Sequence, residues 1–182
     1  MTMLQGEMDV STLCSLTYGD VQEDLTKNEY PLKLDLHGPK TGVEYYTFLG
    51  GDAVNALRVY MKDAEARGVE FNNNPALFLK EKGKSSSKTN NVQNMLKIVV
   101  QKAGLVDGDN NGKAFNPLSP HALRESFGSI MTNARVSKTI VDFWLDHEIG
   151  EMAEVCQAVQ FEGLQRMYLE REKLLSISNA EN

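Results

Sequence analysis

The sequence predicts an α+β fold that is mainly helical and contains a small antiparallel sheet. Apolar residues recur at helical spacing in several segments, such as residues 52–68 and 161–177. Residues 32–49 instead alternate apolar and polar side chains ahead of a turn, which is typical of a β-hairpin. With 182 residues, of which 41% are hydrophobic, the chain is long enough for one domain with a substantial core.

Composition narrows the class of protein. No apolar run approaches the roughly 18 residues needed to cross a bilayer, and the first residues lack the basic and apolar regions of a signal peptide. We therefore expect a soluble cytoplasmic protein with no membrane contact. The two cysteines, Cys14 and Cys156, lie far apart without metal-ligand spacing, which argues against both a disulfide framework and a zinc site.

The charge balance limits how nucleic acid can be bound. A net charge of −6 and a pI near 5.1 weigh against a surface built wholly for nucleic acid, because neutralising phosphates dominates such binding. A local basic face is compatible with this balance, since residues 80–88 are rich in lysine. A solvated loop is the simpler interpretation of that run.

The first part of the chain contains the predicted sheet. Residues 4–16 form a short, mildly apolar segment, which we expect to be a helix or part of one. In residues 32–49, leucines alternate with polar residues, a turn follows at the sequence GPKTG, and β-rich residues complete a second strand. The simplest structure is a hairpin, alone or within a three-stranded sheet, whose loop exposes Lys40.

Two helices are predicted after the hairpin. An amphipathic helix in residues 52–68 ends at Gly68, and helical spacing resumes at about Lys88 and ends at Gly104. The polar segment that follows resembles an acidic calcium loop superficially, but it lacks the closing glutamate of such loops. We therefore expect an ordinary loop there.

The remainder of the chain is predicted to be wholly helical. Ser119 is a favourable N-cap, and Pro120 suits the first position of a helix. Ser137 can cap the next helix, and residues 161–177 form the last helical segment before a fraying tail.

Side chains in this helical part form a candidate anion site. His121 and Arg124 are three residues apart at a helix start, so both point the same way. A guanidinium beside an imidazole at a helix N-terminus suits a phosphate group, because the free N–H groups there favour anions. His147 follows on a later helix, and Cys156 stands nine residues beyond it. The simpler alternative is that His121 only caps its helix.

The segments HALRESFGSIM (121–131) and VSKTIVDFWLDHEIGEMAEVC (136–156) resemble the C-terminal half of a tyrosine recombinase catalytic domain, of the phage integrase family. That family has His-x-x-Arg opening a helix, a Leu-Gly-His box, and a nucleophilic tyrosine nine residues after that histidine. Upstream, MDVSTLCSLTYGDV (8–21) resembles the segment that carries the first catalytic arginine. The resemblance extends from about Met8 to about Tyr168.

The resemblance implies a role for each candidate residue in breaking and rejoining DNA without a metal or other cofactor. Arg124 would be the second phosphate-clamping arginine, and His121 a general acid or base. His147 would bind the phosphate, and Lys40 in the hairpin turn would protonate the leaving oxygen. Cys156 occupies the position of the nucleophile.

The resemblance also implies an architecture and partners. Residues 1–182 would form a single integrase-like catalytic domain, with the family's N-terminal core-binding domain absent. Double-stranded DNA is the expected partner, bound weakly by this domain alone, in site-specific recombination or integration. A homo-oligomer formed through the C-terminal helix is a further possibility, because that helix often packs into a neighbouring protomer in the family.

Two departures from the family pattern predict impaired strand cleavage. Asp9 stands where the first arginine belongs, and a carboxylate repels a phosphate. At Cys156 the sulfur lies only about 3 Å from its Cα by ordinary bond lengths, roughly half the reach of a tyrosine oxygen. Asp146 and Glu125 add negative charge near the same site.

Alternatives to this interpretation remain open. Tyr168 is a candidate for a substitute nucleophile, but a packing role on its helix is the favoured interpretation. The chain can also be a non-catalytic DNA-binding or protein-interaction module that keeps the fold. A thiol enzyme that uses Cys156 with His147 is disfavoured, because no third orienting group is evident.

Overall fold

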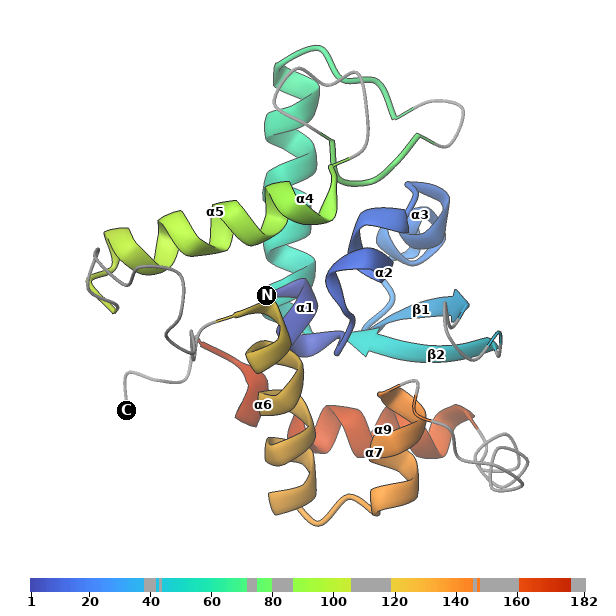
Figure 1. Ribbon diagram of the computed structural model, residues 1–182. Coiled ribbons are helices and arrows are strands. Elements are labelled where there is room, and N and C mark those ends of the chain that lie inside the picture. Colours follow the sequence, from blue (N-terminus) through green and yellow to red (C-terminus); the bar gives the residue numbers. More distant parts are fainter. Residues whose placement is uncertain are drawn as a thin grey trace.

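The computed structural model describes residues 1–37, 42, 44–71, 75–79, 87–105, 119–145, 147 and 161–177. The described part is mostly helical and contains one two-stranded antiparallel sheet, so the predicted fold class is confirmed (Figure 1). Its helices, in chain order, are α1 (Thr2–Gln5), α2 (Val10–Ser15), α3 (Gly19–Lys27), α4 (Gly51–Ala66), α5 (Thr89–Lys102), α6 (Pro120–Asn133), α7 (Lys138–Trp144), α9 (Phe161–Arg171) and the 3-10 turn η2 (Glu172–Leu175).

The predicted hairpin strands are present. β1 (Leu32–His37) pairs with β2 (Glu44–Leu49) in a register that sets Leu32 opposite Leu49 and His37 opposite Glu44. In the described residues the sheet has these two strands, which is the simpler of the two predicted forms. The connecting turn that contains Lys40 lies outside the described residues.

Helices cover both sides of the hairpin. In Figure 1, α2 and α3 lie on one side of the sheet, and α7 and α9 lie on the other. The leucines of β1 are buried, and rings from four different elements fill the core on the α7 side. These rings are Phe48, Phe127, Trp144 and Tyr168, all fully buried.

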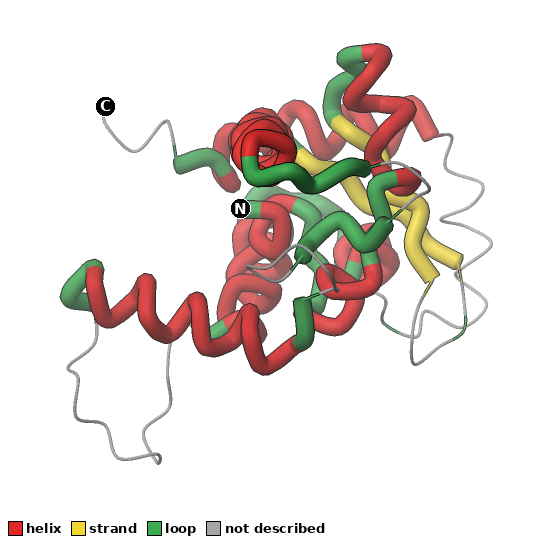
Figure 2. Tube along the Cα trace, turned by 90° about the horizontal axis from the view of Figure 1, so that it is seen from above, coloured by secondary structure: helices red, strands yellow, loops and turns green. Residues whose placement is uncertain are grey.

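Helix α5 has a different environment from the other long helices. It extends away from the rest of the described elements in Figure 1 and, seen from above, at the lower left of Figure 2. Val100 is its only buried residue, and Met95, Ile98 and Val99 are each at least half exposed. No described helix is long and apolar enough to span a membrane.

The predicted helix ends of the second half are confirmed. The Ser119 hydroxyl accepts a hydrogen bond from Ala122 N at 3.2 Å, and Ser137 accepts one from Ile140 N at 3.4 Å. Both are N-caps, as the sequence indicated. Gly68 and Gly104 follow α4 and α5 with φ of +83° and +65°, a conformation that favours glycine.

Two expectations for the first 30 residues were incomplete. The helix expected in residues 4–16 is two short helices, because Gly6 and Glu7 interrupt it and Asp9 starts a new one. Helix α3 was not predicted at all. It is short, and Val21 is its one buried residue, so its apolar face is narrow. Asp20 in its first turn accepts hydrogen bonds from the backbone and hydroxyl of Thr17.

The start of α4 is completed by the end of the described chain. Glu172 Oε1 accepts a hydrogen bond from Gly51 N at 2.7 Å, and Asp52 Oδ2 accepts from Ser176 Oγ and Ile177 N at 2.7 and 2.8 Å. A Cβ on Gly50 would lie 2.5 Å from Glu172, so the carboxylate reaches this helix end only because glycine is there. A side chain from η2 therefore caps α4.

Candidate functional site

Arg124 is mostly buried and is held by two other segments of the chain. Its Nε lies 3.2 Å from Glu7 Oε1, and the two side chains are 16% and 0% exposed. Its Nη2 donates a hydrogen bond to the carbonyl of Leu145, just after α7. The guanidinium therefore joins α6 to the α1–α2 connection and to the end of α7.

Glu7 owes its position to an unusual backbone. Its φ is +54°, in the left-handed region that non-glycine residues seldom adopt. The preceding Gly6 is packed closely, since a Cβ there would lie 2.6 Å from a methyl group of Leu49. This tight turn directs the Glu7 carboxylate inward, where Arg124 is its ion-pair partner.

Asp9, which the sequence resemblance sets at the place of a first arginine, caps α2. Its Oδ1 accepts hydrogen bonds from Thr12 N at 2.8 Å and from Ser11 Oγ at 2.6 Å. Burial raises the pKa of Asp9, but the hydrogen bonds from Ser11 and Thr12 and the charge of Arg124 outweigh it, so this pKa lies below the ordinary value. Asp9 is therefore ionised and adds negative charge near Arg124.

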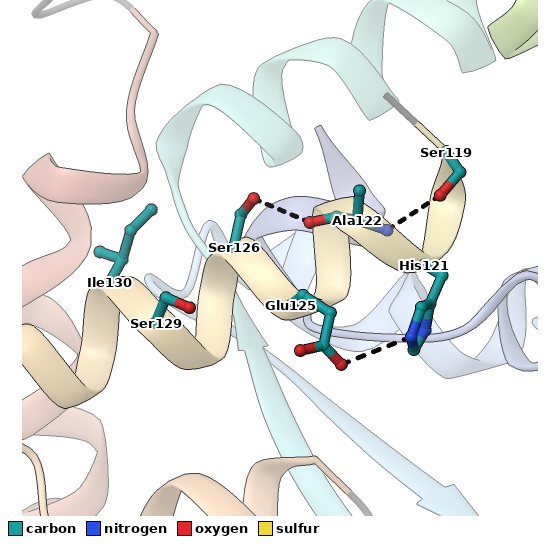
Figure 3. A pocket seen from close by; sticks show the side chains of 7 residues that line it. All are labelled: Ser119, His121, Ala122, Glu125, Ser126, Ser129 and Ile130. Atoms are coloured by element: carbon teal, nitrogen blue, oxygen red, sulfur yellow. Dashed lines mark hydrogen bonds and ion pairs between the residues drawn. The ribbon is translucent and has the colours of Figure 1, made fainter. Parts of the chain in front are cut away.

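His121 lies on the exposed side of α6, apart from these carboxylates. Its Nε2 is 3.5 Å from Glu125 Oε1, and both side chains are largely exposed. The two face each other along an open hollow on the surface of α6 (Figure 3). His121 and Arg124 share a helix start, as predicted, but the expectation that both point the same way is wrong. His121 is exposed beside Glu125, whereas Arg124 is directed at the buried Glu7.

His147 is the third member of the predicted clamp. Its Nδ1 lies 3.3 Å from Asp142 Oδ1, and its backbone N–H donates to the carbonyl of Asp142 at 3.0 Å. Lys138 forms an ion pair with the same carboxylate. Burial raises the pKa of Asp142, but its contacts with Lys138 and His147 lower this pKa by a larger amount. The net pKa lies below the ordinary value, so the carboxyl is ionised.

Tyr168 is a core residue. It is fully buried, its hydroxyl donates to the carbonyl of Gln5 at 3.0 Å, and its ring packs on Phe48 and Trp144. Burial raises its pKa well above the ordinary value, which disfavours the phenolate. The packing interpretation of this tyrosine is confirmed.

Lys40, Asp146 and Cys156 lie outside the described residues, so their predicted roles stay predictions. Sequence reasoning missed the carboxylate partners Glu7 and Asp142. The four-residue spacing of Lys138 and Asp142 was a readable signal for one contact. Glu7 gave no such signal, because its partner is remote in the sequence.

Each basic or imidazole side chain of the clamp that the structure describes contacts a carboxylate of the chain itself. The pairs are Arg124 with Glu7, His121 with Glu125, and His147 with Asp142. A phosphate at this site would therefore compete with internal anions. Among the described residues, no three histidine, cysteine, aspartate or glutamate side chains form a metal-binding group.

Comparisons with known proteins match most of the chain. The model of the phage integrase family matches residues 1–162. The structure is similar to XerA recombinase, with a TM-score of 0.60 and 19% identity over 93% of this chain and 55% of that chain. It is also similar to the integrase from mycobacterium phage Brujita, with a TM-score of 0.60 and 16% identity over 93% of this chain and 49% of that one.

A third similar structure is the XerH site-specific recombinase bound to difH substrate. Its TM-score is 0.58, and the 19% identity extends over 97% of this chain and 43% of that one. The chain thus spans about half the length of these three proteins. No curated protein matches the sequence.

Proposed function

Because the chain belongs to the phage integrase family, we propose that it contacts double-stranded DNA through an integrase-like domain whose strand-cleavage activity is lost or strongly reduced. In this family's reaction, as the resemblance implies, cations stabilise the extra negative charge that the scissile phosphate gains in the transition state.

The observation that carries the proposal is the role of Asp9. The family's first arginine would donate hydrogen bonds to the phosphate, whereas Asp9 is ionised and already accepts hydrogen bonds from Thr12 and Ser11. Loss of one oxyanion donor lowers a rate about 100- to 1000-fold, and an added carboxylate lowers it further by repulsion. Arg124, the proposed second clamp, is paired with Glu7.

The nucleophile supports the same conclusion. Cys156 stands at the tyrosine position, and its side chain is too short to reach a phosphate placed for tyrosine. Tyr168 is the only tyrosine after His147 in the 182 residues, and its hydroxyl is bonded inside the core. Neither residue suits attack on a phosphate held at the start of α6.

The test is a covalent trapping experiment on nicked duplex DNA. After attack, the short strand next to the nick is released, so the cleaved strand cannot be rejoined and any protein–DNA adduct accumulates. Denaturing gels and mass spectrometry detect such an adduct. We expect salt-dependent retention of duplex DNA and no adduct. An adduct mapped to Cys156 or Tyr168 would overturn the inactive assignment.

A protein-interaction module is the alternative function, with a homo-oligomer formed through the C-terminal helix. The apolar residues Leu164 and Tyr168 of α9 are buried in the core of their own chain, so exchange with another copy would have to expose them. Light scattering across protein concentrations separates the two functions. Growth in mass with concentration and no retention on DNA would favour the protein-directed role.

A further inference from the structure

Glu7 combines two features that seldom occur together without a reason. Its backbone has φ of +54°, which costs conformational energy in a non-glycine residue, and its carboxylate is fully buried. Burying an ionised carboxylate is unfavourable unless an opposite charge compensates for it. Here the compensating charge is Arg124, whose Nε lies 3.2 Å from Glu7 Oε1.

We infer that Glu7 is a resident counter-ion that determines whether Arg124 can bind a phosphate group. By neutralising the guanidinium from a buried position beside its Nε, Glu7 gives Arg124 a low affinity for the phosphates of DNA. The inference rests on the proposed function, which places Arg124 at the phosphate site.

The hydrogen-bonding geometry of the guanidinium supports this inference. An arginine binds a phosphate most strongly when two parallel N–H groups face two oxygen atoms. Nε and Nη2 form one of the edges that can do this. In the structure Nη2 donates to the carbonyl of Leu145, and the buried Glu7 carboxylate lies 3.2 Å from Nε as an ion-pair partner. One N–H group of this edge is therefore occupied, and the other lies beside an internal negative charge.

Burial makes the Glu7–Arg124 pair different from the other two pairs at the site. His121 with Glu125 and His147 with Asp142 include side chains that are more than half exposed, so water screens these contacts and they rearrange readily. Water screens the buried Glu7–Arg124 contact much less. Glu7 is therefore the carboxylate that limits anion binding at this site.

The test compares wild-type protein with Glu7→Gln, which keeps the shape of the side chain and removes its charge. Glu65→Gln is the matched control, since Glu65 is exposed on α4 and its replacement changes the net charge equally. Duplex DNA affinity is measured by fluorescence anisotropy over a range of salt concentrations. One freed cation should tighten binding about fivefold to tenfold near 0.1 M salt and steepen the logarithmic salt dependence by about 0.9.

A double variant checks that the gain acts through the arginine. Glu7→Gln combined with Arg124→Ala should bind DNA no more tightly than Arg124→Ala alone. Equal gains for Glu7→Gln and Glu65→Gln would mean that only net charge matters, and they would overturn the inference.

A second measurement uses inorganic phosphate and requires no DNA. The ¹⁵N–¹H signal of Arg124 Nε, assigned with Arg124→Lys, should not respond to phosphate in wild-type protein and should shift in Glu7→Gln. A shift in the wild-type protein would overturn the inference even if Glu7→Gln failed to fold. A shift confined to Glu7→Gln, with no DNA binding by either protein, would support the inference and refute the proposed DNA contact.

Discussion

Removal of the Asp9 side chain should destabilise the protein, because this carboxylate serves the fold. In Asp9→Ala, α2 loses its N-cap, and the hydrogen bonds from Thr12 N and Ser11 Oγ lose their acceptor. Replacing an N-cap residue by alanine costs about 0.5–2 kcal/mol of stability. Because Asp9 is partly buried, we expect Asp9→Ala to cost about 1–2 kcal/mol, in the upper half of that range. Asp9→Asn keeps an acceptor at the same place and should cost about half as much or less.

Urea unfolding followed by circular dichroism measures these differences. The midpoint should fall in the order wild type, Asp9→Asn, Asp9→Ala, with an unchanged dependence on urea. Asp63→Ala is the control, because Asp63 lies on α4 in an exposed ion pair with Arg67 and should change stability by less than about 1 kcal/mol. If Asp9→Ala matched Asp63→Ala, the capping argument would be refuted.

The same variants make a prediction about pH. The folded pKa of Asp9 lies below its unfolded value, so its charge contributes stability that is fully present above the unfolded pKa, near 4. That contribution is lost as the pH falls through the folded pKa. The difference in unfolding free energy between wild type and Asp9→Asn should therefore shrink on acidification below about pH 4. A difference that grew in acid would contradict this assignment.

The remaining predictions concern other buried or shared groups. Tyr168→Phe removes the hydrogen bond to Gln5 and should cost about 1–2 kcal/mol in urea unfolding, without changing the yield of any DNA adduct. Thr47→Val should be neutral or stabilising by up to about 1 kcal/mol, because in the described structure the Thr47 hydroxyl is buried without a partner. Burial, followed by the hydrogen bond to Glu172, raises the pKa of Tyr30 to about 12, so Glu172→Gln should lower it in an ultraviolet absorbance titration. In wild-type protein, the stability from the protonated Tyr30 should be present below pH 10 and be lost as the pH rises through about 12, and an unperturbed Tyr30 would refute this.

Local sequence signals predicted the parts of the fold that depend on neighbouring residues. Ser119 and Ser137 cap helices because a hydroxyl before a helix accepts a hydrogen bond from the first turn, whatever the rest of the chain does. Gly68 and Gly104 end helices for a similarly local reason, their positive φ. The hairpin strands followed from the alternation along β1.

Features that depend on contacts between remote residues could not be predicted from the sequence. Helix α3 is short and most of its residues face solvent, so only Val21 marks its buried face. At the candidate site, the sequence proposed roles for Arg124 and His147 but gave no indication of their electrostatic environment. The partner of Arg124 is Glu7, and only the folded chain brings these two residues together.

The capping of α4 by Glu172 has a consequence for synthesis of the chain. Helix α4 is made early, yet the carboxylate that completes its N-terminus lies 121 residues later. Gln5 depends on the same late segment, since its amide donates to the carbonyl of Leu175 while accepting from Ala53 N. Until the ribosome has added residues 172–177, α4 and α1 lack these partners. The start of α4 is therefore completed only after residues 172–177 have been synthesised, and a protein truncated before Glu172 should leave this helix end frayed.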